Sequence, residues 1–120
     1  MSDDRPVAVT LENRLMSNGY YVTDYEETDG GIDLTYEAVS ESETVTSHEV
    51  GVVVRTVLTI DDEREDWNPG RLEVTSTTTD GSVRGRWHVE ASWFRELAGG
   101  LSSLEFSERV LETVRTPLEE

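Results

Sequence analysis

The stretch TSHEVGVVVRTVLTI, residues 46–60, decides the fold, because its apolar residues fit both a helix and a strand. Helical spacing selects Val50, Val53, Val54, Val57 and Leu58, whereas alternation selects Val50, Val52, Val54, Leu58 and Ile60. Signals at its start favour the helix: Thr46 and Glu49 have the spacing of a capping box, and Val45 and Val50 that of a hydrophobic staple. We therefore predict a helix over residues 46–60. The alternative would add a fifth strand to the sheet.

The residues before this helix predict a first helix and a β-hairpin. Residues 7–18 repeat apolar side chains every four positions and end at Gly19, a typical C-terminal cap. Residues 20–26 and 32–39 are rich in aromatic and β-branched side chains, as strands are. Asp29-Gly30-Gly31 lies between them and can supply the positive φ of a tight turn.

The residues after it predict a second hairpin and two more helices. Residues 72–79 and 83–91 form the strands, with the turn at Asp80-Gly81. Ser92 can cap a short helix that ends at Gly99-Gly100. A final helix is expected over residues 103–115.

The final helix has its own start signals. Ser102 and Glu105 have capping-box spacing, and Leu101 and Phe106 can form a staple.

The resulting order, α-β-β-α-β-β-α-α, predicts an α+β fold. We expect a two-layer sandwich in which two hairpins form an antiparallel four-stranded sheet with the helices on one face. The length of 120 residues suits a single domain over residues 1–120, with residues 1–6 and 116–120 frayed.

The charge composition indicates adaptation to high salt. The chain has 26 acidic residues against 10 cationic ones, a net charge of −16, and every cationic residue is arginine. At molar salt the Debye length falls to about 3 Å, so crowded carboxylates barely repel one another. Intrinsic disorder is the alternative for such a composition, but the aromatic residues and the periodic apolar segments argue against it.

Several classes of protein do not fit the sequence. The absence of cysteine excludes disulfides and thiolate chemistry, and no apolar run approaches the length of a membrane helix. The polar, acidic residues 1–6 do not resemble a signal peptide, so we expect a cytoplasmic protein without membrane contact. The negative charge argues against nucleic acid as a partner.

Four segments carry a resemblance to known proteins. The runs NGYYVTDY (18–25), EVGVVVR (49–55), RGRWHVE (84–90) and FSERVL (106–111) resemble a family of small acidic haloarchaeal proteins of unknown function. The resemblance implies a haloarchaeal source and no particular activity. The order of elements also resembles that of type III secretion chaperones and their YbjN-like relatives, which implies binding of other proteins.

A basic stripe is the clearest candidate for a ligand site. Arg84, Arg86 and His88 alternate with Val83, Trp87 and Val89, so on a strand the three polar side chains would share one face. Such a stripe could bind a small anion or RNA and act in regulation. The simpler interpretation is cross-strand pairing with acidic neighbours.

A protein interface is the main functional prediction. Either the sheet face without helices or the pair Trp67 and Trp93 could bind a protein partner or a second copy of the chain. We therefore predict a non-enzymatic interaction or assembly module, and a homodimer as its simplest form. The second hairpin, residues 72–91, is the expected contact, because the faces of its first strand are low in acidic residues.

No motif predicts catalysis, a cofactor or a metal. The sequence lacks the HExxH, P-loop, GxSxG and GxGxxG patterns, and His48 is expected to be a solvated residue at the start of the central helix. The acidic run 61–66 lacks the spacing of a calcium loop. An enzyme using two carboxylates as acid and base is the alternative that the sequence disfavours.

Overall fold

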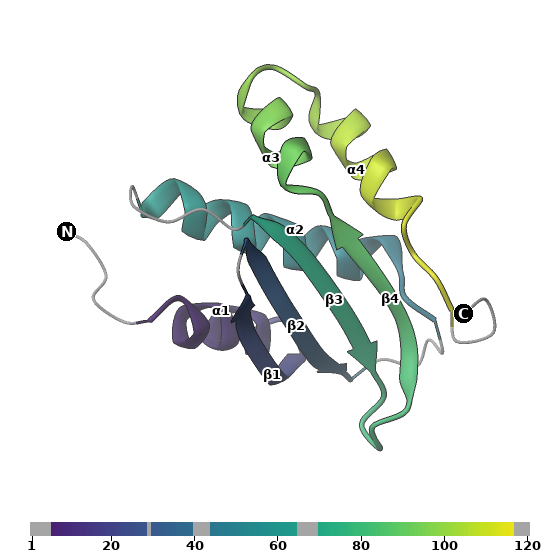
Figure 1. Ribbon diagram of the computed structural model, residues 1–120. Helices are drawn as coiled ribbons and strands as arrows, with labels where there is room; N and C mark the ends of the chain where they lie inside the picture. Colours follow the sequence, from purple (N-terminus) through teal and green to yellow (C-terminus); the bar gives the residue numbers. More distant parts are fainter. Residues whose placement is uncertain (1–5, 29, 40–43, 65–69, 117–120) are drawn as a thin grey trace.

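A computed structural model describes residues 6–28, 30–39, 44–64 and 70–116 (Figure 1). Its elements follow the predicted order. They are α1 (Val7–Met16), β1 (Tyr20–Thr28), β2 (Gly31–Ala38), α2 (Ser47–Glu63), β3 (Arg71–Thr77), β4 (Val83–Val89), α3 (Ala91–Ala98) and α4 (Ser103–Leu111).

Residues 46–60, whose apolar pattern fits both a helix and a strand, begin helix α2, as predicted. The Glu49 amide donates to Thr46 Oγ1 at 3.2 Å, and the Thr46 amide donates to Glu49 Oε1 at 3.3 Å, which completes the capping box. Val53 and Val54 are both buried. The start signals and the burial of one face therefore outweigh the strand preference of the valines.

The sheet has the strand order β1-β2-β3-β4, and its centre differs from the prediction. Both hairpins are antiparallel, but β2 and β3 pair in parallel, with Ile32 opposite Leu72 and Thr35 opposite Thr75. The 17 residues of α2 explain the difference, because a helix of that length spans about 25 Å and returns the chain to the end of the sheet where β2 began.

A close approach of two backbones fixes the start of β3 beside that of β2. The Arg71 amide donates to the Gly30 carbonyl at 3.0 Å. A side chain at Gly70, whose φ is +64°, would meet the Gly30 carbonyl oxygen at 2.4 Å. Only glycine fits this position.

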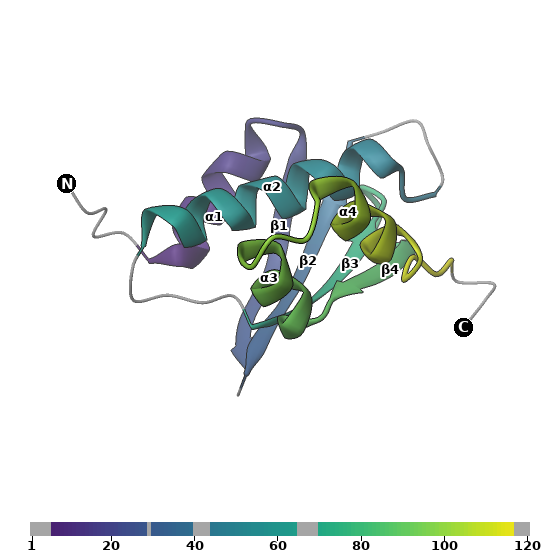
Figure 2. The same cartoon turned by 90° about the horizontal axis from the view of Figure 1, so that it is seen from above.

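The helices cover one face of the sheet, as predicted (Figures 1 and 2). Helices α1 and α2 lie along this face, and α3 and α4 continue the helical layer beyond the end of β4. The core between the layers includes Ile32, Leu34, Tyr36, Val53, Val57, Leu72, Val74, Trp87, Phe106 and Val110. None of the described helices covers the other face, which we call the open face.

The C-terminal part corrects two predicted boundaries. Helix α3 begins at Ala91, and Glu90 occupies its N-cap position without a side-chain hydrogen bond to the helix, so Ser92 is not its cap. Helix α4 is capped by Ser102 as predicted but ends at Leu111 instead of residue 115. It ends early because the Thr113 hydroxyl donates to the Val110 carbonyl (2.7 Å) and accepts from the His88 amide (2.9 Å), which turns the chain toward β4.

Candidate functional site

A β-bulge separates the two arginines that were predicted to share a strand face. Ser76 pairs with Gly85 and Thr77 with Val83, so Arg84 is an extra residue on β4. A bulge of this kind turns a side chain to the other face of the strand. Arg84 is 2% exposed and points into the core, whereas Arg86 is exposed. The predicted stripe of Arg84, Arg86 and His88 is therefore wrong at Arg84.

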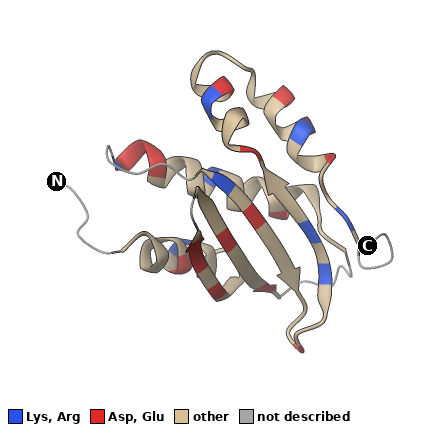
Figure 3. Cartoon of the chain, in the orientation of Figure 1, with Lys and Arg blue, Asp and Glu red and all other residues tan. Residues whose placement is uncertain are grey.

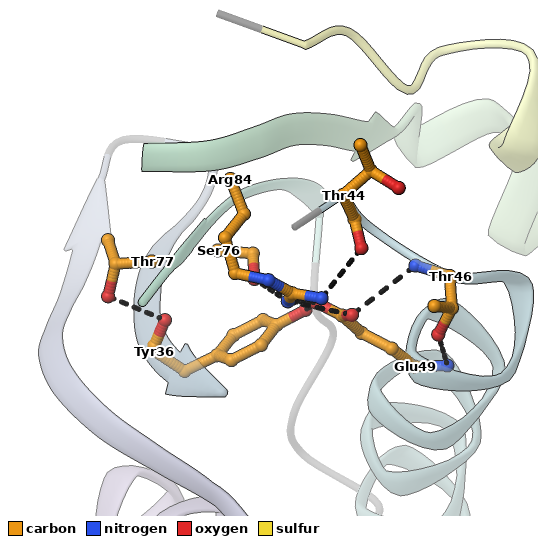
Figure 4. A network of polar contacts seen from close by, with 7 residues as sticks. All are labelled: Tyr36, Thr44, Thr46, Glu49, Ser76, Thr77 and Arg84. Atoms are coloured by element: carbon orange, nitrogen blue, oxygen red, sulfur yellow. Dashed lines mark hydrogen bonds and ion pairs between the residues drawn. The ribbon is translucent and has the colours of Figure 1, made fainter. Parts of the chain in front are cut away.

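Arg84 lies in a buried polar network (Figure 4). Its Nη1 donates to Glu49 Oε1 (2.9 Å), to Glu49 Oε2 (2.8 Å) and to Ser76 Oγ (2.7 Å), and its Nη2 donates to the Thr44 carbonyl (2.6 Å). Ser76 Oγ also donates to Glu49 Oε2 at 2.7 Å, and the Tyr36 hydroxyl donates to the same oxygen. Burial, and then the nearby Glu49 carboxylate, raise the pKa of Tyr36.

This network is a structural element and not a ligand site. The side chains of Arg84 and Glu49 are 1% and 2% exposed, so no ligand can reach them. The network joins α2, β2, β3 and β4 through charge-assisted hydrogen bonds. It also supplies hydrogen-bond donors to the carboxyl group of Glu49, which is buried in the first turn of α2.

Arg115, and not Arg84, lies beside Arg86 on the open face. Its amide and carbonyl pair with those of Arg86 at 2.8 and 2.9 Å, as an isolated antiparallel bridge on the outer edge of β4. The two residues of such a pair point to the same face with Cα atoms about 5.5 Å apart. The prediction missed Arg115 because it placed this residue inside the last helix. Gly85 was the signal in the sequence, because a glycine inside a strand often marks the close approach of another backbone. A side chain at Gly85 would lie 2.9 Å from the Arg115 carbonyl oxygen.

A shallow cavity of about 350 Å³ lies between these arginines and the neighbouring strands. Its lining comprises Asp33, Glu73, Val74, Thr75, Arg86, Trp87, His88, Thr113 and Arg115. His88 Nε2 lies 3.1 Å from Glu90 Oε1, and the His88 ring stacks on Trp93 with centroids 5.9 Å apart. The structure thus brings together Arg86, His88 and Trp93, while Trp67 lies outside the described residues.

The rest of the open face is acidic. Glu26, Asp33 and Glu73 stand in one cross-strand row that ends at His88, and all three carboxylates are exposed. Like charges opposite one another on neighbouring strands destabilise a sheet. Arg71 relieves one of them, with Nε 3.0 Å from Glu73 Oε1.

Charge on the open face is therefore sorted by strand. Acidic residues lie on β1, β2 and β3, and basic residues lie on β4 and on the segment after α4 (Figure 3). Of the two arginines of β4, only Arg86 belongs to this face, because Arg84 is buried. Arg71 at the start of β3 is the exception.

The described residues contain neither a metal site nor a membrane-spanning helix. Within the part of the chain that the structure describes, no group of three or more histidine, aspartate or glutamate side chains is placed to hold a metal ion. The acidic run 61–66 is split: α2 continues to Glu63, and residues 65 and 66 are not described. Among the described helices, none combines the length and apolar character needed to cross a bilayer.

The fold and the site define a small α+β protein with an open mixed sheet whose exposed face is divided by charge. The chain belongs to the family described as "Domain of unknown function (DUF8159)", which matches residues 1–120. No curated protein matches the chain, and no solved structure does. The family agrees with the predicted resemblance to proteins of unknown function. The haloarchaeal source and the likeness to secretion chaperones stay predictions.

Proposed function

We propose that this protein is an interaction module that assembles with a second copy of itself through the open face. One observation carries the proposal: the acidic strands β1–β3 and the basic edge formed by Arg86, His88 and Arg115 lie on the same uncovered face. A surface that is acidic on one side and basic on the other complements itself under a two-fold rotation. The acidic residues of β1 then face the basic edge of the second copy, whereas Asp33 faces Glu73 of the second copy and keeps an acidic neighbour.

The geometry of the sheet fixes the arrangement. A two-fold axis parallel to the strands, passing between β2 and β3, places β4 of one copy over β1 of the other. Because Asp24, Thr35, Thr75 and Arg86 share one cross-strand row, Asp24 then faces Arg86 of the second copy. In the same way Glu26 faces His88 of the second copy, and the two threonines meet at the centre. This extends the predicted contact surface from the second hairpin, residues 72–91, to the whole open face.

The proposed setting is a cytoplasm rich in salt. The excess of carboxylates and the lack of lysine support it, because carboxylates hold water and hydrated cations at the surface. In that setting the ion pairs between the copies would be weakened by screening but would still select the orientation.

Charge-swapped variants test the proposal. Arg86→Glu with Arg115→Glu removes the basic edge, and Asp24→Arg with Glu26→Arg removes its acidic counterpart. Each double variant is expected to be monomeric by light scattering, and an equimolar mixture of the two is expected to form a heterodimer. Glu12→Arg with Arg95→Glu changes exposed charges on α1 and α3 and serves as the control. A wild-type mass of one chain at all concentrations, or dimers in both variants, would refute the proposal.

A small oxyanion is the second candidate partner. The Arg86–Arg115 pair favours it, because two neighbouring guanidinium groups that share a cavity can hold one phosphate or carboxylate. RNA is a weaker candidate, because the acidic strands beside the pair repel a long polyanion. Titration with inorganic phosphate, followed by amide shifts of Thr75, Arg86 and Thr113, tests the small anion.

We do not propose an enzyme. His88, the histidine that lines the cavity, is already paired with Glu90 and stacked on Trp93.

A further inference from the structure

A second cavity lies in the helical layer, between α1 and α2. It has a volume of about 370 Å³, and its lining comprises Arg14, Ser17, Asn18, Val52, Arg55, Thr56 and Thr59. Although the chain has a net charge of −16, none of these lining residues is acidic. The volume is within the range of about 300–1,000 Å³ that is typical of small-molecule sites.

Two arginines supply positive charge to this cleft. Arg14 Nη2 lies 2.7 Å from Glu63 Oε1, which leaves its other nitrogens available. The side chain of Arg55 is exposed and forms no hydrogen bond or ion pair with any residue in the described part of the chain. The dipole of α1 stabilises a cation near the C-terminal end of the helix, and Arg14 in the last turn already provides that cation. The α1 dipole therefore does not account for Arg55.

Hydroxyl groups supply acceptors beside these donors. Ser17, Thr56 and Thr59 each donate their hydroxyl hydrogen to a helix carbonyl one turn back, at 3.1, 2.8 and 2.8 Å. A hydroxyl has one hydrogen and two lone pairs, so each of these oxygens can still accept. The cleft thus pairs guanidinium donors with hydroxyl acceptors.

We propose that the cleft between α1 and α2 binds a small phosphorylated polyol. Its phosphate lies between Arg14 and Arg55, and its hydroxyl groups donate to Ser17, Thr56 and Thr59. The inference is independent of the proposed dimer, because the cleft belongs to the helical layer and not to the open face.

Amide chemical shifts would test the site directly. The full chain is titrated with glycerol phosphate, inorganic phosphate and glycerol, at the lowest KCl concentration at which it is folded. Glycerol phosphate is expected to shift the amides of Ser17, Asn18 and Thr59 and to bind more tightly than phosphate, and glycerol alone is expected to bind least. Absence of shifts at the cleft, or equal affinities for glycerol phosphate and phosphate, would overturn the proposal.

Two arginine variants sharpen the test. Arg55→Gln is expected to weaken binding of glycerol phosphate by about tenfold, the loss of one charged hydrogen bond. Arg95→Gln changes an exposed arginine of α3 and should leave binding unchanged. Equal effects of the two variants would overturn the assignment of Arg55.

Removal of the competing carboxylate gives the opposite change. Glu63→Gln frees Arg14 from its ion pair and is expected to tighten binding by up to about fivefold, since an exposed pair is worth at most ~1 kcal/mol. A gain in affinity cannot arise from misfolding. Weaker or unchanged binding in Glu63→Gln would overturn the role of Arg14.

Discussion

Arg84 and Arg86 lie two positions apart on one strand, yet they belong to different regions of the molecule. Arg84 is enclosed with Glu49, Ser76 and Tyr36 in the core, and Arg86 lies beside Arg115 on the open face. Strand alternation alone would place them together, and one bulge separates them. The difference teaches that the identity of a residue predicts its chemistry, whereas the register of the strand decides where that chemistry acts.

The two regions also respond differently to their surroundings. Exposed charges are screened by salt, whereas buried pairs are screened much less. Substitutions in the two regions are therefore expected to differ in their cost to stability and in their response to salt.

The largest effect is expected from removing salt. At about 10 mM the Debye length grows to ~30 Å, so repulsion among the exposed carboxylates extends across the whole domain. We expect circular dichroism to show the folded state in molar KCl and a substantial loss of signal near this low concentration. Equal stability under both conditions would refute the interpretation that the acidic composition is an adaptation to high salt.

Of the two arginines, Arg84 should contribute more to the free energy of unfolding. Arg84→Met leaves the buried Glu49 carboxylate without its cation, which is expected to cost about 3–5 kcal/mol of unfolding free energy. The matched variant Arg86→Met removes an exposed charge and should cost about 1 kcal/mol or less. Urea unfolding in molar KCl measures both, and similar losses would remove the distinction between the regions.

The double variant Arg84→Met with Glu49→Met separates packing from charge. Replacing both partners of a buried pair by apolar residues often has little net effect. We therefore expect the double variant to recover most of the stability that Arg84→Met loses.

Tyr36 should make the buried region sensitive to alkaline pH. Burial and Glu49 raise its pKa in the folded chain above the ordinary value of 10.0. The neutral phenol is thus favoured by folding, so its contribution is complete below pH 10 and is lost as the pH rises above it. Tyr36→Phe should cost about 1–3 kcal/mol at neutral pH.

Tyr36→Phe should also flatten the alkaline loss of stability. Unfolding free energies measured across the alkaline range test this expectation, and Tyr21→Phe on the exposed face is the control. An alkaline profile that Tyr36→Phe leaves unchanged would contradict the role of Tyr36.

The smallest effect concerns the helix caps. Thr46→Ala should cost about 0.5–2 kcal/mol, and its loss should exceed that of Ser102→Ala. Thr46 caps α2, whose first turn carries the buried Glu49, whereas Ser102 caps the exposed start of α4. Thermal unfolding compares the two variants, and a larger loss for Ser102→Ala would contradict the expectation.

Local signals predicted most of the fold. The cap at Thr46, the glycines at the turns and the alternation in β2 each act within a few residues, so the order of elements could be derived from the sequence. The parallel pairing of β2 with β3 could not, because it depends on where α2 returns the chain. A hairpin pattern is the same whether its neighbour runs parallel or antiparallel.

The candidate site was predicted only in part, for the same reason. Arg86, His88 and Trp93 were identified from their own strand and helix, and they do lie close together. The burial of Arg84 depends on Glu49, which is distant in sequence, and the position of Arg115 depends on the early end of α4. Contacts of this range have no signature in local periodicity.

The parallel seam between β2 and β3 also has a kinetic consequence. Each hairpin joins neighbouring segments, and hairpins form within about 1–10 μs. The seam joins residues on opposite sides of α2, so its closure carries the entropy cost of a long loop and sets the pace of folding. Substitutions that weaken the seam should slow refolding, whereas substitutions in the hairpin turns should act mainly on the rate of unfolding.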